Sequence, residues 1–410
     1  MSRSAGLSEL KAAPKKQSVD VLIVGGGMSG VSVAWYLATN PGFTGSIAVV
    51  ERDPSYEFAS TTHTNSCIRQ QFSTELNIRI SQYAADFFTE LAGEPWRSMA
   101  APELSIREFG YLYLANDSAS AQRLRVSHEL QKRCGVGCEL LSADDIKARY
   151  PFYAVDDLVL GSLNRRDEGY FDGGGLFQWW RQTSARMGVE YLNDEVCGLQ
   201  RNTNGERLES VRLQSGATIH CGVLINAAGP RARQVANLAD IVLPVEPRKR
   251  YTYVFAAAQP LSQELPLTID PSGVHVRSDA SYYMAGCAPT PDLAVAYDDF
   301  AADHGLWEAR VWPELARRIP QFEQVKLMNS WVGHYAYNPF DRNAIVGPDP
   351  HCENFFFING FSGHGLQQAP AMGRGLAELI VHGSYQTLDL SALGVARIAA
   401  NAPITEQAVI

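Results

Sequence analysis

The stretch Val21-Leu22-Ile23-Val24-Gly25-Gly26-Gly27-Met28-Ser29-Gly30-Val31 decides the fold class of this chain. An apolar run that ends in closely spaced glycines and continues into helix-forming residues predicts a buried parallel strand, a tight turn and a helix. Gly25 permits the turn, Gly27 lets a phosphate approach the backbone, and Gly30 lets helix and strand pack closely. This spacing is the fingerprint of a dinucleotide-binding unit.

The residues around this turn complete the unit. Met28 and Ser29 stand at the predicted helix start, where backbone N–H groups and the helix dipole favour phosphate. The next apolar run, 47–50, ends at Glu51 and is followed by Arg52. Glu51 lies about 20 residues beyond the last glycine, where a ribose-binding carboxylate is expected.

Composition narrows the class of protein. The chain has 410 residues, more than a single hydrophobic core usually supports, so two domains are expected. A formal net charge of −9 and the absence of long Lys/Arg runs argue against a nucleic-acid partner. No apolar stretch reaches the roughly 20 residues that span a bilayer. Seven scattered cysteines suggest neither a disulfide framework nor a metal site. The N-terminal residues lack the apolar segment expected of a secretory signal. The cysteines are expected to be reduced and mostly buried, which fits a cytoplasmic location.

The rest of the chain alternates between helices and strands at both ends and is rich in strands in between. Apolar spacing predicts helices over 76–92, 119–133 and 175–187, and a meander over 196–225. We therefore expect an α/β fold, with a Rossmann-type domain and an inserted antiparallel sheet.

A second glycine cluster, Gly360-Phe361-Ser362-Gly363-His364-Gly365, follows another apolar run and precedes a helix from about Leu366. A simple interpretation is a helix N-terminus capped by Ser362. With the first glycine turn, it fits a different arrangement better. One helix start would bind a pyrophosphate and the other would face a flavin ring, stabilising the negative charge of the reduced form.

Four segments together give a family resemblance: Gly25-x-Gly27-x-x-Gly30, Asn226-Ala227-Ala228-Gly229, Trp331-Val332-Gly333 and the 360–365 cluster. They resemble the superfamily of FAD-dependent D-amino acid oxidases, sarcosine oxidases and glycine oxidases over about residues 19–385. Segments 247–251, 311–313 and 363–370 resemble the branch that holds a mitochondrial assembly factor of respiratory complex I. The resemblance implies FAD, oxidation of a C–N bond in an amine or amino acid, and hydride transfer to flavin N5.

The resemblance also implies a domain division. We expect a discontinuous FAD-binding domain from 18–82, 140–235 and 325–395, and a substrate domain from 83–139 and 236–324. Residues 1–17 are expected to form a flexible tail and 396–410 a second tail. The predicted cofactor contacts are Gly25, Gly27, Met28, Ser29, Gly30, Glu51, Arg52, His63, Val196, Ala228, Gly229, Gly333, Gly360, Ser362, Gly363, His364, Gly365 and Leu366.

The resemblance assigns substrate-side roles to five further residues. Arg69 stands where monomeric sarcosine oxidases bind the substrate carboxylate, and a guanidinium suits that group. Gln367 replaces their lysine, and Tyr335 stands where glycine oxidases place an arginine. His334 lies near the position of the flavin-bearing cysteine of sarcosine oxidases. Tyr251 lies on a strand expected to face the substrate or the core.

Two further expectations concern the flavin. No lysine occurs between Lys249 and Lys326, where sarcosine oxidases carry the lysine that activates dioxygen. This gap favours a dehydrogenase that passes electrons to a quinone or an electron-transfer flavoprotein. His63 matches a loop that carries covalent flavin in dimethylglycine dehydrogenases, so covalent attachment at His63 or His334 stays open.

Two alternatives to an amine oxidoreductase remain. One is a flavin-binding assembly factor that turns over no substrate. The other is a 2-hydroxy acid dehydrogenase, for which His63, His334 and His364 are candidate proton acceptors.

Overall fold

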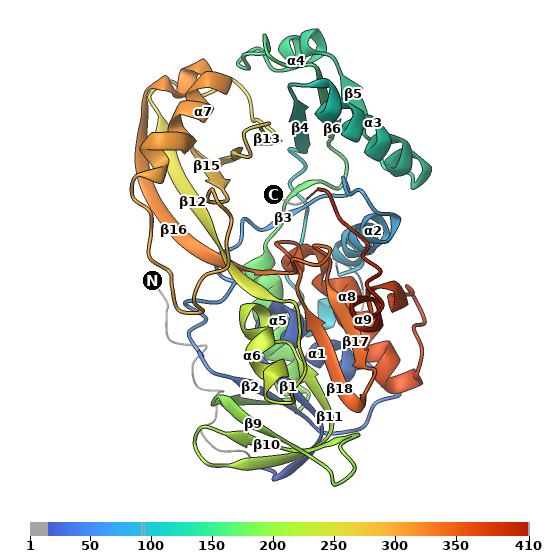
Figure 1. Cartoon of the computed structure of the whole chain (residues 1–410). Helices are drawn as coiled ribbons and strands as arrows, with labels where there is room; N and C mark the ends of the chain where they lie inside the picture. The colour runs from blue at the N-terminus through green and yellow to red at the C-terminus, as the bar shows by residue number, and fades with distance from the viewer. Residues whose placement is uncertain (1–14, 92, 94, 409–410) are drawn as a thin grey trace.

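The computed structural model describes residues 15–91, 93 and 95–408. It contains two large sheets, one above the other in Figure 1. Most of the predicted N-terminal tail, 1–17, lies outside the described residues. Within the described part of the chain, no helix is long and apolar enough to cross a membrane.

The first sheet has the glycine-turn strand near its centre. Its order is β17 (Ile345–Asp349), β18 (Cys352–Asn359), β11 (Thr218–Asn226), β1 (Ser18–Val24), β2 (Ile47–Glu51) and β8 (Glu190–Asn193). Along these six strands all neighbours pair in parallel except β17 and β18. The sheet's other two strands extend it from β11 in antiparallel pairs. The loops after the parallel strands therefore meet at one edge of the sheet, which is where such folds bind ligands.

Helices cover one face of this sheet and a meander covers the other. On the first face, α1 (Met28–Thr39), α2 (Glu75–Glu90), α5 (Gly173–Arg186) and α8 (Gly365–His382) share one apolar core with the sheet. On the other face lie β9 (Val196–Arg201), β10 (Leu208–Leu213) and α6 (Ala232–Asn237). The pairing of β9, β10 and β11 confirms the predicted meander.

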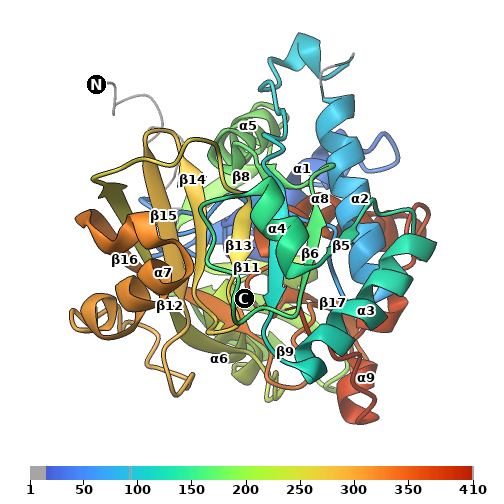
Figure 2. The same ribbon diagram turned by 90° about the horizontal axis from the view of Figure 1, so that it is seen from above.

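The second sheet is mostly antiparallel and lies over the ligand edge of the first. Its order is β16 (Val325–Tyr337), β12 (Glu246–Ala257), β15 (Tyr282–Cys287), β14 (His275–Asp279), β13 (Leu267–Ile269), β4 (Tyr111–Ala115), β6 (Leu160–Asn164) and β5 (Glu139–Leu141). The helices α4 (Ala143–Arg149) and α7 (Trp312–Arg318) contribute to its core, and α3 (Ser118–Arg133) packs at its β5–β6 end (Figure 2). A two-stranded pair, β3 (Cys67–Ile68) with β7 (Gly169–Tyr170), lies between the large sheets. The mixed α/β architecture is the predicted one.

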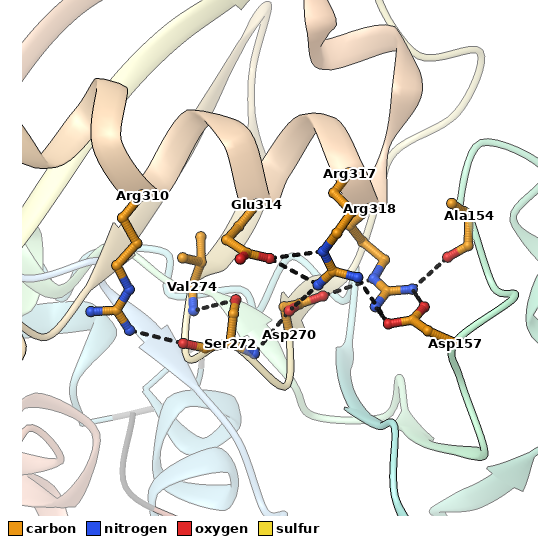
Figure 3. Close-up of polar contacts among 9 residues, drawn as sticks. All are labelled: Ala154, Asp157, Asp270, Ser272, Val274, Arg310, Glu314, Arg317 and Arg318. Carbon is orange, nitrogen blue, oxygen red and sulfur yellow. Dashed lines mark hydrogen bonds and ion pairs between the residues drawn. The ribbon is translucent and has the colours of Figure 1, made fainter.

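An ion-pair network around the buried Arg318 and Asp270 connects the two halves of the second sheet (Figure 3). Arg318 on α7 lies 2.7 Å from Asp270 and 2.8 Å from Asp157. Arg317 reaches the same two carboxylates and also Glu314. Because Asp270 follows β13 and Asp157 precedes β6, the network ties both sides of the sheet to α7.

The structure corrects the predicted boundaries at three places. Strands β5 and β6 lie in the second sheet, although 140–235 was assigned to the FAD-binding domain. Strand β16 also lies there, although 325–395 was assigned to that domain. The predicted boundary at 82/83 falls inside α2, which packs on the first sheet. Apolar alternation identifies a strand but does not reveal which sheet it joins, and this explains the errors.

The segment 396–410 is not a free tail over its described part. It begins with α9 (Ala396–Ala399), and Arg397 is paired with the buried Asp341 at 2.8 Å. Glu406 is fully buried and accepts hydrogen bonds from Ser73 and Asn77. A buried carboxylate with several donors anchors the segment firmly.

Candidate functional site

A cavity of about 970 Å³ lies between the two sheets. It runs from the glycine turn after β1 to the inner face of the second sheet, a size at the upper end for cofactor sites. All predicted site residues line it except Gly30, Gly360 and Ser362. Those present are Gly25, Gly27, Met28, Ser29, Glu51, Arg52, His63, Arg69, Val196, Ala228, Gly229, Tyr251, Gly333, His334, Tyr335, Gly363, His364, Gly365, Leu366 and Gln367.

The glycine turn has the geometry that its spacing predicts. Gly25 has φ +101°, and a Cβ there would lie 2.5 Å from the carbonyl oxygen of Ala227. Gly30 does not line the cavity, because it packs α1 against the turn, where a Cβ would collide with the Gly25 carbonyl. Gly27 precedes the first residue of α1 and borders the cavity. The helix start is therefore open to a phosphate.

Glu51 stands at the end of β2, beside this turn. Its Oε2 accepts the Gly26 N–H at 2.7 Å, and its Oε1 accepts the Asp53 N–H at 2.8 Å. Burial raises the pKa of Glu51. The backbone therefore holds the carboxylate in place at the cavity wall, in the position that a ribose-binding residue needs.

The second glycine turn places the start of α8 on the wall of the same cavity. His364 precedes the helix, so Ser362 is not its N-cap. Ser362 Oγ instead accepts the Asn338 N–H at 3.0 Å and lies outside the cavity lining. Its backbone has φ +49°, and Gly360 and Gly363 also have positive φ, so three of the four residues 360–363 have left-handed backbone conformations. Ser362 and Gly360 therefore contribute to the backbone conformation of the turn and do not line the cavity.

Arg69 is a buried, charged residue on the cavity wall. It is 3 % exposed, and its Nη2 donates to His364 Nε2 at 2.9 Å and to the carbonyl of Ala408. Its backbone N–H donates to Gln367 Oε1 at 2.9 Å. No ion pair among the described residues involves Arg69. A buried guanidinium without a carboxylate is suited to an anionic ligand.

Gln367 and Tyr335 line the cavity and also make contacts within the protein. Gln367 Oε1 supports the backbone of Arg69, so this atom serves structure. The Tyr335 ring packs against Gly363, where a Cβ would collide with it. The guanidinium of Arg250 lies 4.6 Å from the centre of the same ring. Tyr335 therefore joins the α8 turn to the second sheet.

The two candidate histidines for flavin attachment lie side by side. A Cβ at Gly333 would lie 2.7 Å from His63 Cβ. His63 Nδ1 lies 3.1 Å from the Ala59 carbonyl oxygen. His334 is stacked on Phe300 at 4.0 Å, and its Nε2 lies 2.9 Å from the Asp299 carbonyl oxygen. Both ring positions are thus defined at one wall of the cavity.

Several cavity residues were missed or left open by sequence reasoning. Tyr251 borders the cavity and also belongs to the apolar core of the second sheet. Tyr253 belongs to the same core, where its ring packs against Trp307 in a tilted arrangement. Arg250 and His275 line the cavity from β12 and β14. His275 lies between Val274 and Val276, so in a strand it faces the opposite side from the two valines. This alternation is a signal that could have identified His275.

These features fit FAD. The first helix start, the fixed Glu51 and the second helix start at Gly365 lie on one continuous cavity. A family model described as "FAD dependent oxidoreductase" matches residues 20–379, and the chain belongs to this family of flavoproteins. FAD is therefore its cofactor.

Particular relatives agree with the family. The chain is 36 % identical over 405 residues to bovine "FAD-dependent oxidoreductase domain-containing protein 1", covering 91 % of this chain and 83 % of that protein. It is 26 % identical to sarcosine oxidase subunit beta of Rhizobium meliloti, covering 90 % and 86 % of the two chains. Its fold matches L-proline dehydrogenase from P. horikoshii with a TM-score of 0.79 and 23 % identity, covering 95 % and 98 %.

Proposed function

We propose that this flavoprotein oxidises the C–N bond of a secondary amine or N-substituted amino acid, and that it acts as a dehydrogenase. The observation that carries the proposal is Arg69, a buried cation on the cavity wall without a carboxylate partner among the described residues. FAD, when bound, supplies the acceptor for the hydride that leaves the carbon next to nitrogen. Sarcosine oxidase and proline dehydrogenase, which the chain resembles, are named for such substrates.

Arg69 is arranged to hold a carboxylate at a fixed place. Its charge cannot be lost, because a guanidinium remains protonated throughout the range in which proteins work. His364 accepts a hydrogen bond from it, and burial together with the Arg69 charge lowers the pKa of His364 well below its usual value. The imidazole therefore stays neutral and adds no second positive charge to the carboxylate subsite.

The dehydrogenase proposal rests on the cations of the second sheet. Lys249 lies 2.6 Å from Asp299, and Arg250 lies 2.9 Å from Asp292, so both charges are compensated. Strands β14 and β15 contain no lysine. Reaction with dioxygen is promoted by an uncompensated cation at the reduced ring. Because the charge of Arg69 is assigned to the substrate carboxylate and the cations of the second sheet are paired, a separate acceptor is proposed. A quinone or an electron-transfer flavoprotein would serve.

Covalent attachment, if it occurs, is proposed at His63. His334 is held by both ring contacts, the stack on Phe300 and the Asp299 carbonyl. His63 uses Nδ1 toward the Ala59 carbonyl, and this leaves Nε2 as the nucleophilic nitrogen.

The carboxylate proposal is tested by binding. Arg69→Met should weaken the binding of sarcosine and of acetate to the FAD-loaded protein by about 30-fold or more, because the loss of a buried charge partner costs about 2–5 kcal/mol. Arg166→Met, at a position whose side chain is 82 % exposed, serves as the control. Equal affinities for Arg69→Met and the wild type would contradict the role of Arg69.

A further inference from the structure

His275 lies on the face of the second sheet that borders the cavity. It pairs with Gly286 of β15 across the β14–β15 ladder. A Cβ at position 286 would lie 2.6 Å from His275 Nε2, so the imidazole lies over the glycine. Asn65, on the loop before β3, lies within hydrogen-bonding distance of the ring, and both residues line the cavity. The ring therefore contacts both the glycine and the loop.

The pair leaves two buried polar atoms without partners. Asn65 Nδ2 lies 3.3 Å from His275 Nε2 and donates to it, so the imidazole proton lies on Nδ1. Among the described residues, His275 Nδ1 and Asn65 Oδ1 have no hydrogen-bond partner, although His275 is only 8 % exposed. If the amide is turned over, donor and acceptor exchange places. In either arrangement the pair offers one donor and one acceptor.

Buried polar atoms in native proteins are almost always hydrogen-bonded, and unpaired ones call for an explanation. These two atoms belong to neighbouring side chains on the wall of a cavity that binds small molecules. Both atoms have almost no accessible surface, so a ligand reaches them only when the two side chains turn toward the cavity. A ligand that brings both an acceptor and a donor would then satisfy them together. Such groups include a primary amide and a hydroxyl.

The charges around the pair define the chemistry of that ligand group further. Arg250 and Arg277 flank His275, but Asp292 compensates the first and Asp279, at 2.8 Å, the second. Burial and the nearby arginines lower the pKa of His275 to about 4, so the ring is neutral at physiological pH. Arg69 alone of these three arginines lacks a carboxylate partner among the described residues. This part of the cavity wall is therefore suited to bind one anionic group and one uncharged polar group.

We propose that Asn65 and His275 form a second recognition subsite, which binds an uncharged amide or hydroxyl group of a substrate whose carboxylate is held by Arg69. The proposal rests on the proposed function and makes it more specific. The substrate is then an N-substituted amino acid with a single carboxylate and a neutral hydrogen-bonding group. His275 and Asn65 are specificity-determining residues that take no part in the chemical step.

The subsite is tested with three small carboxylates on the FAD-loaded protein, by isothermal titration calorimetry. Malonamate carries an amide, 3-methylbutanoate has the same shape without polar groups, and malonate carries a second charge. Malonamate should bind about 10-fold or more tightly than 3-methylbutanoate, the effect of two satisfied hydrogen bonds. Malonate should bind no more tightly than malonamate. Equal affinities of malonamate and 3-methylbutanoate would overturn the subsite.

Three variants test whether the subsite causes this preference. His275→Phe and Asn65→Leu should each reduce the advantage of malonamate to about 2-fold or less and leave 3-methylbutanoate binding nearly unchanged. Gly286→Ala should have the same effect by displacing the ring, and unchanged FAD content would show that each variant is folded. An advantage that survives in all three variants overturns the proposal. If no carboxylate binds the wild type, the role of Arg69 fails as well, and this separates the two failures.

Discussion

Glu168 gives a quantitative test of how the loop that carries Arg69 is built. This carboxyl is fully buried and accepts the N–H groups of Gln70 at 2.7 Å and Gln71 at 3.0 Å, directly after Arg69. The Gln71 side chain donates to it as well. Burial outweighs these bonds and raises the pKa of Glu168 from 4.5 to about 7. The protonated form therefore fits the folded protein better than the carboxylate does.

The direction and size of the effect follow from this pKa. Below pH 4.5 the group is protonated in both the folded and the unfolded state, and its full contribution to stability is present. Between pH 4.5 and about 7 only the folded state keeps the proton, so stability falls as the pH rises. The loss amounts to about 3 kcal/mol, since each pKa unit corresponds to about 1.4 kcal/mol.

Glu168→Gln mimics the protonated group and should remove this pH dependence. Urea unfolding at half-unit steps from pH 4.5 to 8 gives the free energy of unfolding for each protein. The difference between the variant and the wild type should grow by about 3 kcal/mol in favour of the variant across this range. Glu209→Gln, on the exposed side of β10, is the control and should follow the wild type. Parallel curves for Glu168→Gln and the wild type would refute the reasoning.

Four further predictions test other parts of the structure. Gly30→Val should yield protein with little bound FAD, measured as the ratio of flavin to protein, because its side chain would push α1 away from the glycine turn; full occupancy would contradict the packing role. Glu406→Gln should increase amide hydrogen exchange over 402–408 by about 10-fold or more, through loss of a hydrogen bond from Asn77 or Thr74. Asp270→Asn should destabilise the protein by about 3 kcal/mol, because Arg318 loses a buried partner; a shift in unfolding below 1 kcal/mol would argue against the network. If His63 carries the flavin, acid-precipitated wild-type protein should stay yellow and His63→Ala should not; a yellow variant pellet would exclude His63.

The sequence identified the parts of the site in which function depends on local backbone geometry. Gly25 and Gly30 could be assigned because a tight turn and a close helix–strand approach require glycine at fixed spacing. Glu51 followed from its place at the end of the next strand. The comparisons confirm the family, the fold class and FAD.

The substrate side was harder to predict, because long-range packing determines it. The contact of Arg69 with Ala408 joins residues 339 positions apart, and no local pattern indicates it. His275 lies in β14, whose sequence His-Val-Arg-Ser-Asp contains several polar residues, so alternation alone did not distinguish it from them. Ser362 was expected to contact the cofactor, but it lies outside the cavity lining and its Oγ accepts the N–H of Asn338, 24 residues away in the chain. Sheet membership of β5, β6 and β16 likewise depends on contacts far apart in the chain.

An anaerobic titration of the purified protein, followed through the flavin absorbance near 450 nm, tests the central claim most directly. The panel contains sarcosine, dimethylglycine, cyclic and N-carbamoylmethyl amino acids, and short 2-hydroxy acids. We expect bleaching by at least one N-substituted amino acid and none by the hydroxy acids, with slow recovery when air is admitted. A flavin band that no amine bleaches, or that only hydroxy acids bleach, would contradict the account.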